Sequence, residues 1–154
     1  MFLNYDVAEE DVKQILLKSD VSQVLQNVVE YLYKRFGAYS WVGIYLVEGE
    51  YLVLGPWKGR QATEHTKISI GDGVCGSAAQ SGKTEVVADV SKDGRYLACF
   101  VSTRSEIVVP IKKKGVVVGE IDIDSDVPDA FSESDVVFLE KVAGMLGKCM
   151  VDLQ

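Results

Sequence analysis

Cysteines carry the most reactive side chains of this sequence, because a thiolate is both a nucleophile and a reductant. Cys75 lies between glycines in Gly73-Val74-Cys75-Gly76, where a helix is expected to begin. A helix N-terminus stabilises a thiolate, although a tight turn around a buried, inert cysteine fits the same pattern. Cys99 lies in a long polar segment, and such segments are often functional. Ala98-Cys99-Phe100 equally fits a hydrophobic anchor that holds this segment against the core.

Three acidic residues follow a spacing that fits the binding of a cation. Asp122 and Asp124 alternate with isoleucines in an expected strand, and the two-residue period of a strand puts both carboxylates on one face. Glu106 opens the neighbouring expected strand, so the three acids could converge on one ammonium group. Such a cluster raises one carboxyl pKa, which suits that group to act as an acid. A solvated outer strand face fits the same alternation.

The remaining candidates carry weaker patterns. Trp57, which follows Gly55-Pro56, fits either the wall of a pocket or a half-buried loop tryptophan. Cys149 shares a helical stripe with apolar residues, which predicts core packing. His65 is the only histidine and no CxxC pair is present, so we expect neither a structural zinc site nor a histidine-dependent nucleophile.

Hydrophobic periodicity and turn signals predict the elements that must position these residues. We expect helices over residues 7–18, from Asp20 (as N-cap) to near Gly37, from about Val74 and from Ser132 onward, and strands over residues 40–47, 51–54, 66–70, 85–88, 106–112 and 116–124. Residues 132–135 fit a capping box, and Lys112 to Lys114 fit a solvated hairpin tip. The strands form hairpins and do not alternate one-for-one with helices. We therefore predict an α+β fold with a central antiparallel sheet flanked by N-terminal and C-terminal helices.

Length, composition and charge limit the classes of function. The 154 residues predict one domain, and 47% hydrophobic with 25% charged residues is ordinary for a soluble globular protein. A net charge of -7 argues against a nucleic-acid partner, because no excess of cations is present to meet phosphates. Neither a signal-peptide pattern nor an apolar run long enough to span a membrane is present, so we expect a cytoplasmic protein without a membrane partner. In that compartment we expect no permanent disulfide among the three cysteines, and any pairing between them to be transient.

Several segments, taken in order, resemble the free methionine-R-sulfoxide reductases, a family of GAF-domain proteins. These segments cover nearly the whole chain: residues 40–46, 52–57, 73–78, 98–99, 105–110 and 122–125. The resemblance implies that residues 1–154 form a single GAF domain that reduces free L-methionine (R)-S-oxide to methionine. Preference for the R epimer rests on the resemblance alone. A homodimer through the N-terminal helices is a further expectation for GAF domains.

The resemblance also assigns roles to residues. Cys99 matches the nucleophile of the family, and Cys75 matches the cysteine that resolves the sulfenic acid into a disulfide. Trp57 matches an aromatic residue that helps to enclose the substrate. The acidic residues that hold the substrate and assist departure of the sulfoxide oxygen are matched by Glu106, Asp122 and Asp124. An external dithiol such as thioredoxin would reduce the disulfide, and neither a cofactor nor a metal is implied.

One position departs from the pattern of the family. Many members carry a further cysteine shortly after the Gly-Pro-aromatic segment, and Thr63 stands there in this chain. Cys149, in the last expected helix, should not replace it. The two-cysteine cycle needs only Cys99 and Cys75, so the departure bears on auxiliary resolution more than on activity.

Two other functions share part of this pattern. A GAF signalling or small-molecule-binding module without catalysis would have the same fold, because fold alone does not separate these uses. A thiol-based redox sensor would oxidise the same cysteines but would leave the acidic cluster without a purpose. Saturable consumption of free methionine sulfoxide separates catalysis from both alternatives.

Overall fold

The computed structural model describes residues 4–96, 100 and 102–150. In this part of the chain, four α-helices accompany two short 3-10 helices, η1 (Val21–Gln23) and η2 (Val90–Lys92). The α-helices are α1 (Tyr5–Lys18), α2 (Val24–Arg35), α3 (Gly73–Ser81) and α4 (Glu133–Met150). The strands are β1 (Trp41–Glu48), β2 (Tyr51–Gly59), β3 (Lys67–Ser69), β4 (Glu85–Val87), β5 (Ser105–Lys113) and β6 (Val116–Ser125).

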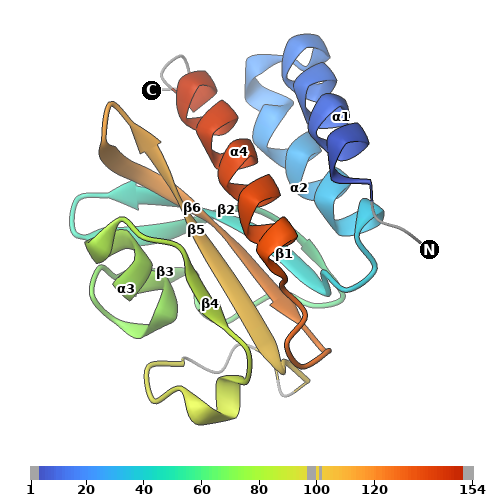
Figure 1. Cartoon of the computed structure of the whole chain (residues 1–154). Coiled ribbons are helices and arrows are strands. Elements are labelled where there is room, and N and C mark those ends of the chain that lie inside the picture. Colours follow the sequence, from blue (N-terminus) through green and yellow to red (C-terminus); the bar gives the residue numbers. More distant parts are fainter. Residues whose placement is uncertain (1–3, 97–99, 101, 151–154) are drawn as a thin grey trace.

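The strands form one antiparallel sheet in the order β3-β2-β1-β6-β5-β4, which confirms the expected fold class (Figure 1). Strand β6 lies between β1 and β5, and its residues from Gly119 to Asp124 have a partner on both sides. Asp124 faces Trp41 on β1 and Glu106 on β5. The sheet therefore brings residues from three separate segments to one end of β6.

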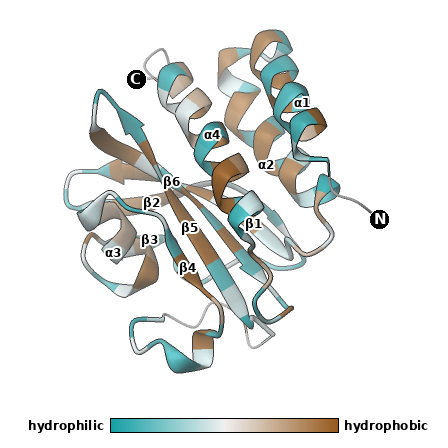
Figure 2. Ribbon diagram, in the orientation of Figure 1, coloured by the Kyte–Doolittle hydropathy of each residue, from teal (hydrophilic) through white to brown (hydrophobic). Residues whose placement is uncertain are grey.

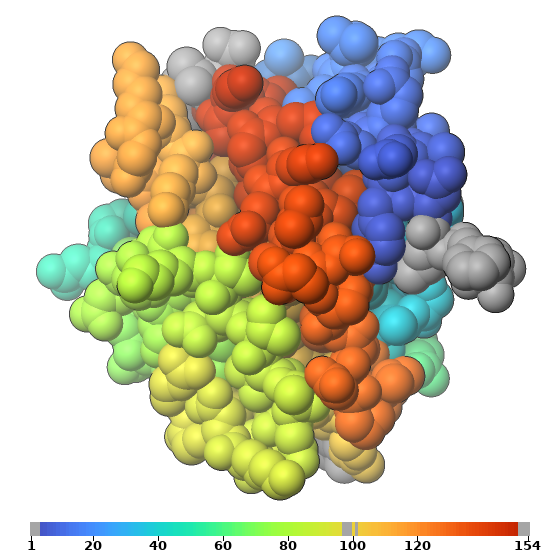
Figure 3. Space-filling model, viewed as in Figure 1, coloured from blue at the N-terminus to red at the C-terminus, as the bar shows by residue number. Residues whose placement is uncertain are grey.

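Alternate residues of the central strands contribute to two separate cores. Ile121 and Ile123 pack in a core that is completed by α1, α2 and α4, whereas Val108 packs in a second core under α3. Figure 2 shows hydrophobic residues recurring along the helices and central strands, with hydrophilic residues between them. In the space-filling view, α4 (red) lies between the N-terminal helices and the segment that contains α3 (Figure 3). The face under α3 carries Asp122 and Asp124.

Strand β2 is longer than the sequence predicted. We expected it to end at Leu54, because Gly55 and Pro56 interrupt regular structure, yet it continues to Gly59. The register with β1 shifts between Gly43 and Tyr45, opposite these two residues. Such a bulge accommodates a proline, which has no N–H group to donate to the neighbouring strand.

The helix ends show where local signals succeed and fail. The expected capping box of α4 is confirmed: the Ser132 backbone N–H donates to Asp135 Oδ2 across 2.9 Å, and the Asp135 N–H donates to Ser132 Oγ across 3.4 Å. We expected Asp20 to cap α2, and this expectation is wrong. Asp20 precedes η1 and makes no side-chain capping bond, and α2 begins later, at Val24.

The hairpin turn between β5 and β6 lies at the predicted place. Lys114 and Gly115 both have positive φ angles, of 51° and 81°, as a tight hairpin turn requires. Within residues 4–96, 100 and 102–150, no helix has the length and apolar character needed to cross a membrane.

Candidate functional site

The indole of Trp41 lies flat on the sheet because glycines make room for it. A Cβ atom on Gly43 would lie 2.3 Å from Trp41 Cη2, and one on Gly59 would lie 2.4 Å from Trp41 Cδ1. Gly43 is two residues further along the same strand face, and Gly59 is the partner of Trp41 across the β1–β2 pair. The ring is thereby fixed beside Asp124, its partner on β6.

Four carboxylic acids are buried on the face of the sheet that α3 covers. Their exposed fractions are 3% for Glu106, 0% for Glu120, 1% for Asp122 and 1% for Asp124. The sequence predicted that three of them share a face, and the alternation of β6 confirms it. The alternative of a solvated outer strand face is wrong, because α3 and the residues around it exclude solvent.

Burial sets the protonation of this acidic cluster (Glu106, Glu120, Asp122 and Asp124). It is the largest cause that raises the pKa of Glu106 and Asp124 well above their ordinary values, and the charge of Asp122 raises both further. Burial also raises the pKa of Glu120 and of Asp122. Like charges so close in a low-dielectric site cannot all be ionised together. The cluster therefore holds protons that it can release, or exchange for a cation.

Cys75 lies in the first turn of α3 and points at this cluster. Its Sγ donates to Asp122 Oδ2 across 3.3 Å, and its side chain is buried. Burial raises the pKa of the thiol well above its ordinary value, and the charges of Asp122, Glu120 and Glu106 raise it further. We expected the helix N-terminus to stabilise a thiolate at this position. That expectation is wrong here, because burial and the carboxylates outweigh the dipole, so Cys75 is a neutral thiol.

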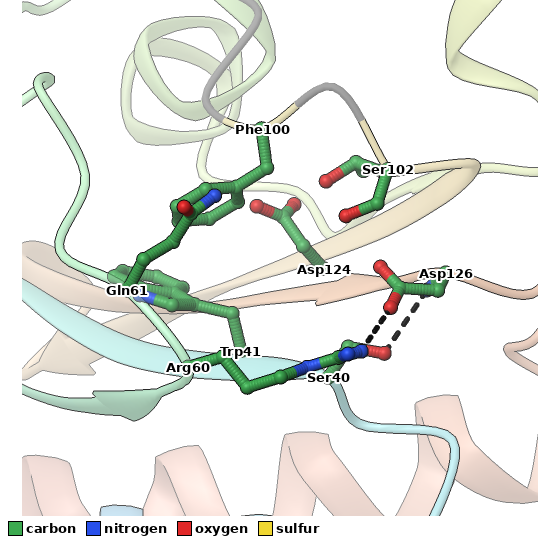
Figure 4. Close-up of a pocket in the computed structure, with 9 residues that line it drawn as sticks. Ser40, Trp41, Arg60, Gln61, Phe100, Ser102, Asp124 and Asp126 are labelled. Atoms are coloured by element: carbon green, nitrogen blue, oxygen red, sulfur yellow. Dashed lines mark hydrogen bonds and ion pairs between the residues drawn. The ribbon is translucent and has the colours of Figure 1, made fainter.

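A pocket of about 220 Å³ opens at the ends of β1 and β6, beside Asp124 (Figure 4). The rings of Trp41 and Phe100, with centroids 5.9 Å apart, form its apolar walls. Figure 4 shows the Asp124 carboxylate directed toward the side chains of Phe100 and Gln61. At the rim, Arg60 forms an ion pair with Asp126.

Several buried polar atoms at this pocket have no hydrogen-bond partner among the described residues. They are both carboxylate oxygens of Asp124, the indole Nε1 of Trp41 and the hydroxyl Oγ1 of Thr103. Buried polar groups in proteins are almost always satisfied, and each exception calls for a cause. The two Asp124 oxygens are acceptors, and the Trp41 and Thr103 groups can donate. Together they are complementary to a ligand that carries both a positive and a negative group.

The other residues that the sequence singled out lie in different settings. Trp57 is partly buried and stacks on Trp41, with ring centroids 6.2 Å apart, but it is not among the residues that line the pocket. Cys149 packs at the margin of the core that α4 helps to form. Thr63 is buried, and its Oγ1 accepts a hydrogen bond from the His65 backbone N–H across 3.1 Å. Cys99 lies outside the described residues; Phe100, which follows it in the chain, lines the pocket.

Sequence reasoning missed two residues of this site. Glu120 precedes Asp122 by two residues on β6, so the alternation that grouped the aspartates extends to it. Trp41 stands two residues before Gly43, and a large aromatic residue followed on its own face by glycine is a signal that a ring lies flat on the sheet. Either pattern, read further along the strand, would have identified the residue.

Comparisons with known proteins agree with this architecture. A family model described as the GAF domain matches residues 20–150. The chain is 41% identical over 134 residues to GAF domain-containing protein A of Dictyostelium discoideum, covering 85% of this chain and 83% of that protein. It is 36% identical over 126 residues to the free methionine-R-sulfoxide reductase of Escherichia coli, covering 82% of this chain and 75% of that protein.

A solved structure shows the same likeness across the whole fold. The free methionine-R-sulfoxide reductase of Neisseria meningitidis, solved in complex with its substrate, is 36% identical to this chain. The two superpose with a TM-score of 0.89 over 96% of this chain and 88% of that one. The resemblance noted in the sequence is therefore confirmed over matched segments that include the sheet, α3 and α4. This chain belongs to the free methionine-R-sulfoxide reductase family of GAF-domain proteins.

Proposed function

We propose that this protein reduces free L-methionine (R)-S-oxide to methionine, with Cys99 as nucleophile, Cys75 as resolving cysteine and thioredoxin as external reductant. The observation that carries the proposal is the state of the Asp124 carboxylate. Its two carboxylate oxygens are buried, have no hydrogen-bond partner among the described residues and border the pocket. The ammonium group of a free amino acid would supply the missing charge, whereas a peptide-bound methionine sulfoxide has no such group. The names of the relatives in Escherichia coli and Neisseria meningitidis support the same substrate.

The pocket suits the rest of the substrate as well. Trp41 and Phe100 offer apolar surface to the side chain of the amino acid, and Arg60 is the one cation among its described lining residues. Trp57 contributes to substrate binding indirectly, because its ring stacks on Trp41 and holds that ring in place. Asp122 stands two residues deeper on β6 and adds negative charge to the same end of the pocket.

The chemistry begins with attack of the Cys99 thiolate on the sulfoxide sulfur. Burial raises the pKa of Glu106, which favours its protonated form and suits it to protonate the sulfoxide oxygen. The oxygen passes to the cysteine sulfur as hydroxyl, methionine leaves with two electrons gained, and Cys99 becomes a sulfenic acid. One sulfoxide is thereby reduced and one thiol is oxidised.

Cys75 completes the cycle. Its sulfur attacks Cys99, a disulfide forms, and the sulfenic hydroxyl leaves as water with the thiol proton. Asp122 already accepts the hydrogen bond from Cys75 and can pass that proton on to the departing hydroxyl. Because Cys75 is buried and neutral until then, it does not compete with Cys99 for the substrate. A dithiol such as thioredoxin then reduces the disulfide.

Replacement of Cys99 tests the proposal, because a serine hydroxyl cannot replace the thiolate. We expect Cys99→Ser to abolish methionine formation from the separated R epimer with dithiothreitol as reductant. Cys149→Ser, the matched control in α4, should retain nearly the full rate. Retention of more than a few per cent of activity in Cys99→Ser would contradict the role of Cys99. Binding of methionine sulfoxide without turnover by the unaltered protein would favour a non-catalytic GAF module instead.

A further inference from the structure

Cys75, Glu106 and Asp122 form a compact group of metal-ligand atoms. The thiol sulfur and one carboxylate oxygen from each acid all lie within 4.8 Å of one another, and all three residues are buried. Zinc binds sulfur at about 2.3 Å and carboxylate oxygen at about 2.0–2.2 Å in a tetrahedral arrangement. A sulfur and an oxygen ligand around one zinc ion are therefore roughly 3.5–3.7 Å apart, and the 3.3 Å between Cys75 Sγ and Asp122 Oδ2 is close to that distance.

A fourth residue points independently to a cation at this place. Glu120 is fully buried, and neither of its carboxylate oxygens has a hydrogen-bond partner among the described residues. Glu120 and Asp122 are two residues apart on β6, so their side chains lie on the same face of the sheet. The second oxygen of Asp122, Oδ1, is also without a partner. An unpartnered buried carboxylate is costly unless a positive charge accompanies it.

We propose that Cys75, Glu106 and Asp122 form a binding site for a thiophilic divalent cation such as Zn²⁺, with Glu120 as the anionic group behind them. Three anionic ligands leave one tetrahedral position for water. Calcium requires six to eight oxygen ligands and magnesium requires an octahedron of oxygens, so the sulfur and the small donor set select against both. Binding converts the Cys75 thiol to a thiolate and releases its proton to solvent.

This site shares Cys75, Glu106 and Asp122 with the proposed catalytic cycle, so a bound cation would inhibit the enzyme. A cation on the Cys75 sulfur prevents that sulfur from attacking Cys99. It also occupies the carboxylates of Glu106 and Asp122, which are then unavailable for proton transfer. The inhibitory consequence rests on the proposed function, whereas the binding of the cation does not. This group could not be predicted from the sequence, because its ligands come from three separate segments and include no histidine.

Cadmium titration of a protein whose single cysteine is Cys75 tests the site directly. In the Cys99→Ser, Cys149→Ser double variant, treated first with chelator, we expect one equivalent of Cd²⁺ to give a thiolate-to-metal charge-transfer band. Glu106→Gln in this background should weaken Cd²⁺ binding at least ~10-fold, while the matched control Glu64→Gln, at an exposed position, should leave it unchanged. Affinity should rise with pH, because binding releases protons.

Two results would overturn the proposal. The absence of a thiolate band in the Cys75-only protein would show that Cys75 is not a ligand. Equal affinities in the Glu106→Gln and Glu64→Gln variants would show that the carboxylates are not ligands. In the wild-type protein, one equivalent of Zn²⁺ should stop methionine release in a single turnover without external thiol, and a chelator should restore it. Undiminished release would refute inhibition; release absent even without zinc would count against the proposed function alone.

Discussion

Replacement of Asp124 by asparagine should have opposite effects on substrate capture and on stability. The carboxylate borders the pocket, is 1% exposed and has no partner on either oxygen among the described residues. Loss of one member of a desolvated charge pair costs on the order of 2–5 kcal/mol. That range corresponds to a rise in KM for free methionine sulfoxide of roughly 30-fold to several thousand-fold. The maximal rate should change less, because Asp124 is not assigned a proton transfer.

The effect on stability follows from the direction of the pKa shift. Burial and the charge of Asp122 raise the pKa of Asp124 in the folded protein. Its contribution to stability is therefore fully present below the unfolded pKa, about 3.9, and is lost as the pH rises through the folded value. Asparagine does not titrate. The free energy of unfolding of Asp124→Asn, measured relative to the wild type, should increase as the pH rises from about 4 toward 8.

Thermal unfolding without substrate, at several pH values, measures this second effect. For a domain of this size, each 1 kcal/mol shifts Tm by about 2–4 °C. The Tm difference should move in favour of the variant as the pH rises, while steady-state kinetics at pH 7 should show the raised KM. An unchanged KM, or a Tm difference that is independent of pH, would refute the assignment of Asp124 as a buried carboxylate that binds the ammonium group of the substrate.

The two remaining substitution and mapping predictions concern the chemical steps. Glu106→Gln should mainly lower kcat, because it removes the proton donor at the departing oxygen, and steady-state kinetics that show only a raised KM would contradict this role. Oxidation by one equivalent of substrate should join Cys75 to Cys99, and peptide mapping of the quenched protein should find that bond. A dominant Cys75–Cys149 or intermolecular bond would show that Cys75 has a different partner.

The shared face of the acids could be predicted from sequence, but their burial could not. The two-residue period of a strand is a property of the backbone, so Asp122 and Asp124 had to lie together. Whether that face meets water depends on α3, which is distant in the sequence. The same reason explains the error at Cys75. A local pattern contains the helix N-terminus but not the carboxylates that β5 and β6 bring beneath it.

The aromatic residues show a second limit of local patterns. Trp57 follows a Gly-Pro pair and drew attention for that reason, but Trp41 is the tryptophan that lines the pocket. Gly59, which allows the Trp41 ring to lie flat, is 18 residues away and becomes its neighbour only through the register of β1 with β2. That register includes the bulge opposite Pro56, which the sequence did not predict.

Comparison of free with N-acetylated methionine (R)-sulfoxide tests the central claim most directly. Both compounds carry the same sulfoxide, but only the free amino acid has an ammonium group for the buried carboxylates beside the pocket. With dithiothreitol as reductant, kcat/KM for the acetylated compound should be lower by roughly 30-fold or more, the lower limit for loss of a desolvated charge pair. Equal kcat/KM values for the two compounds would contradict the account, because the acids would then have no part in selecting a free amino acid.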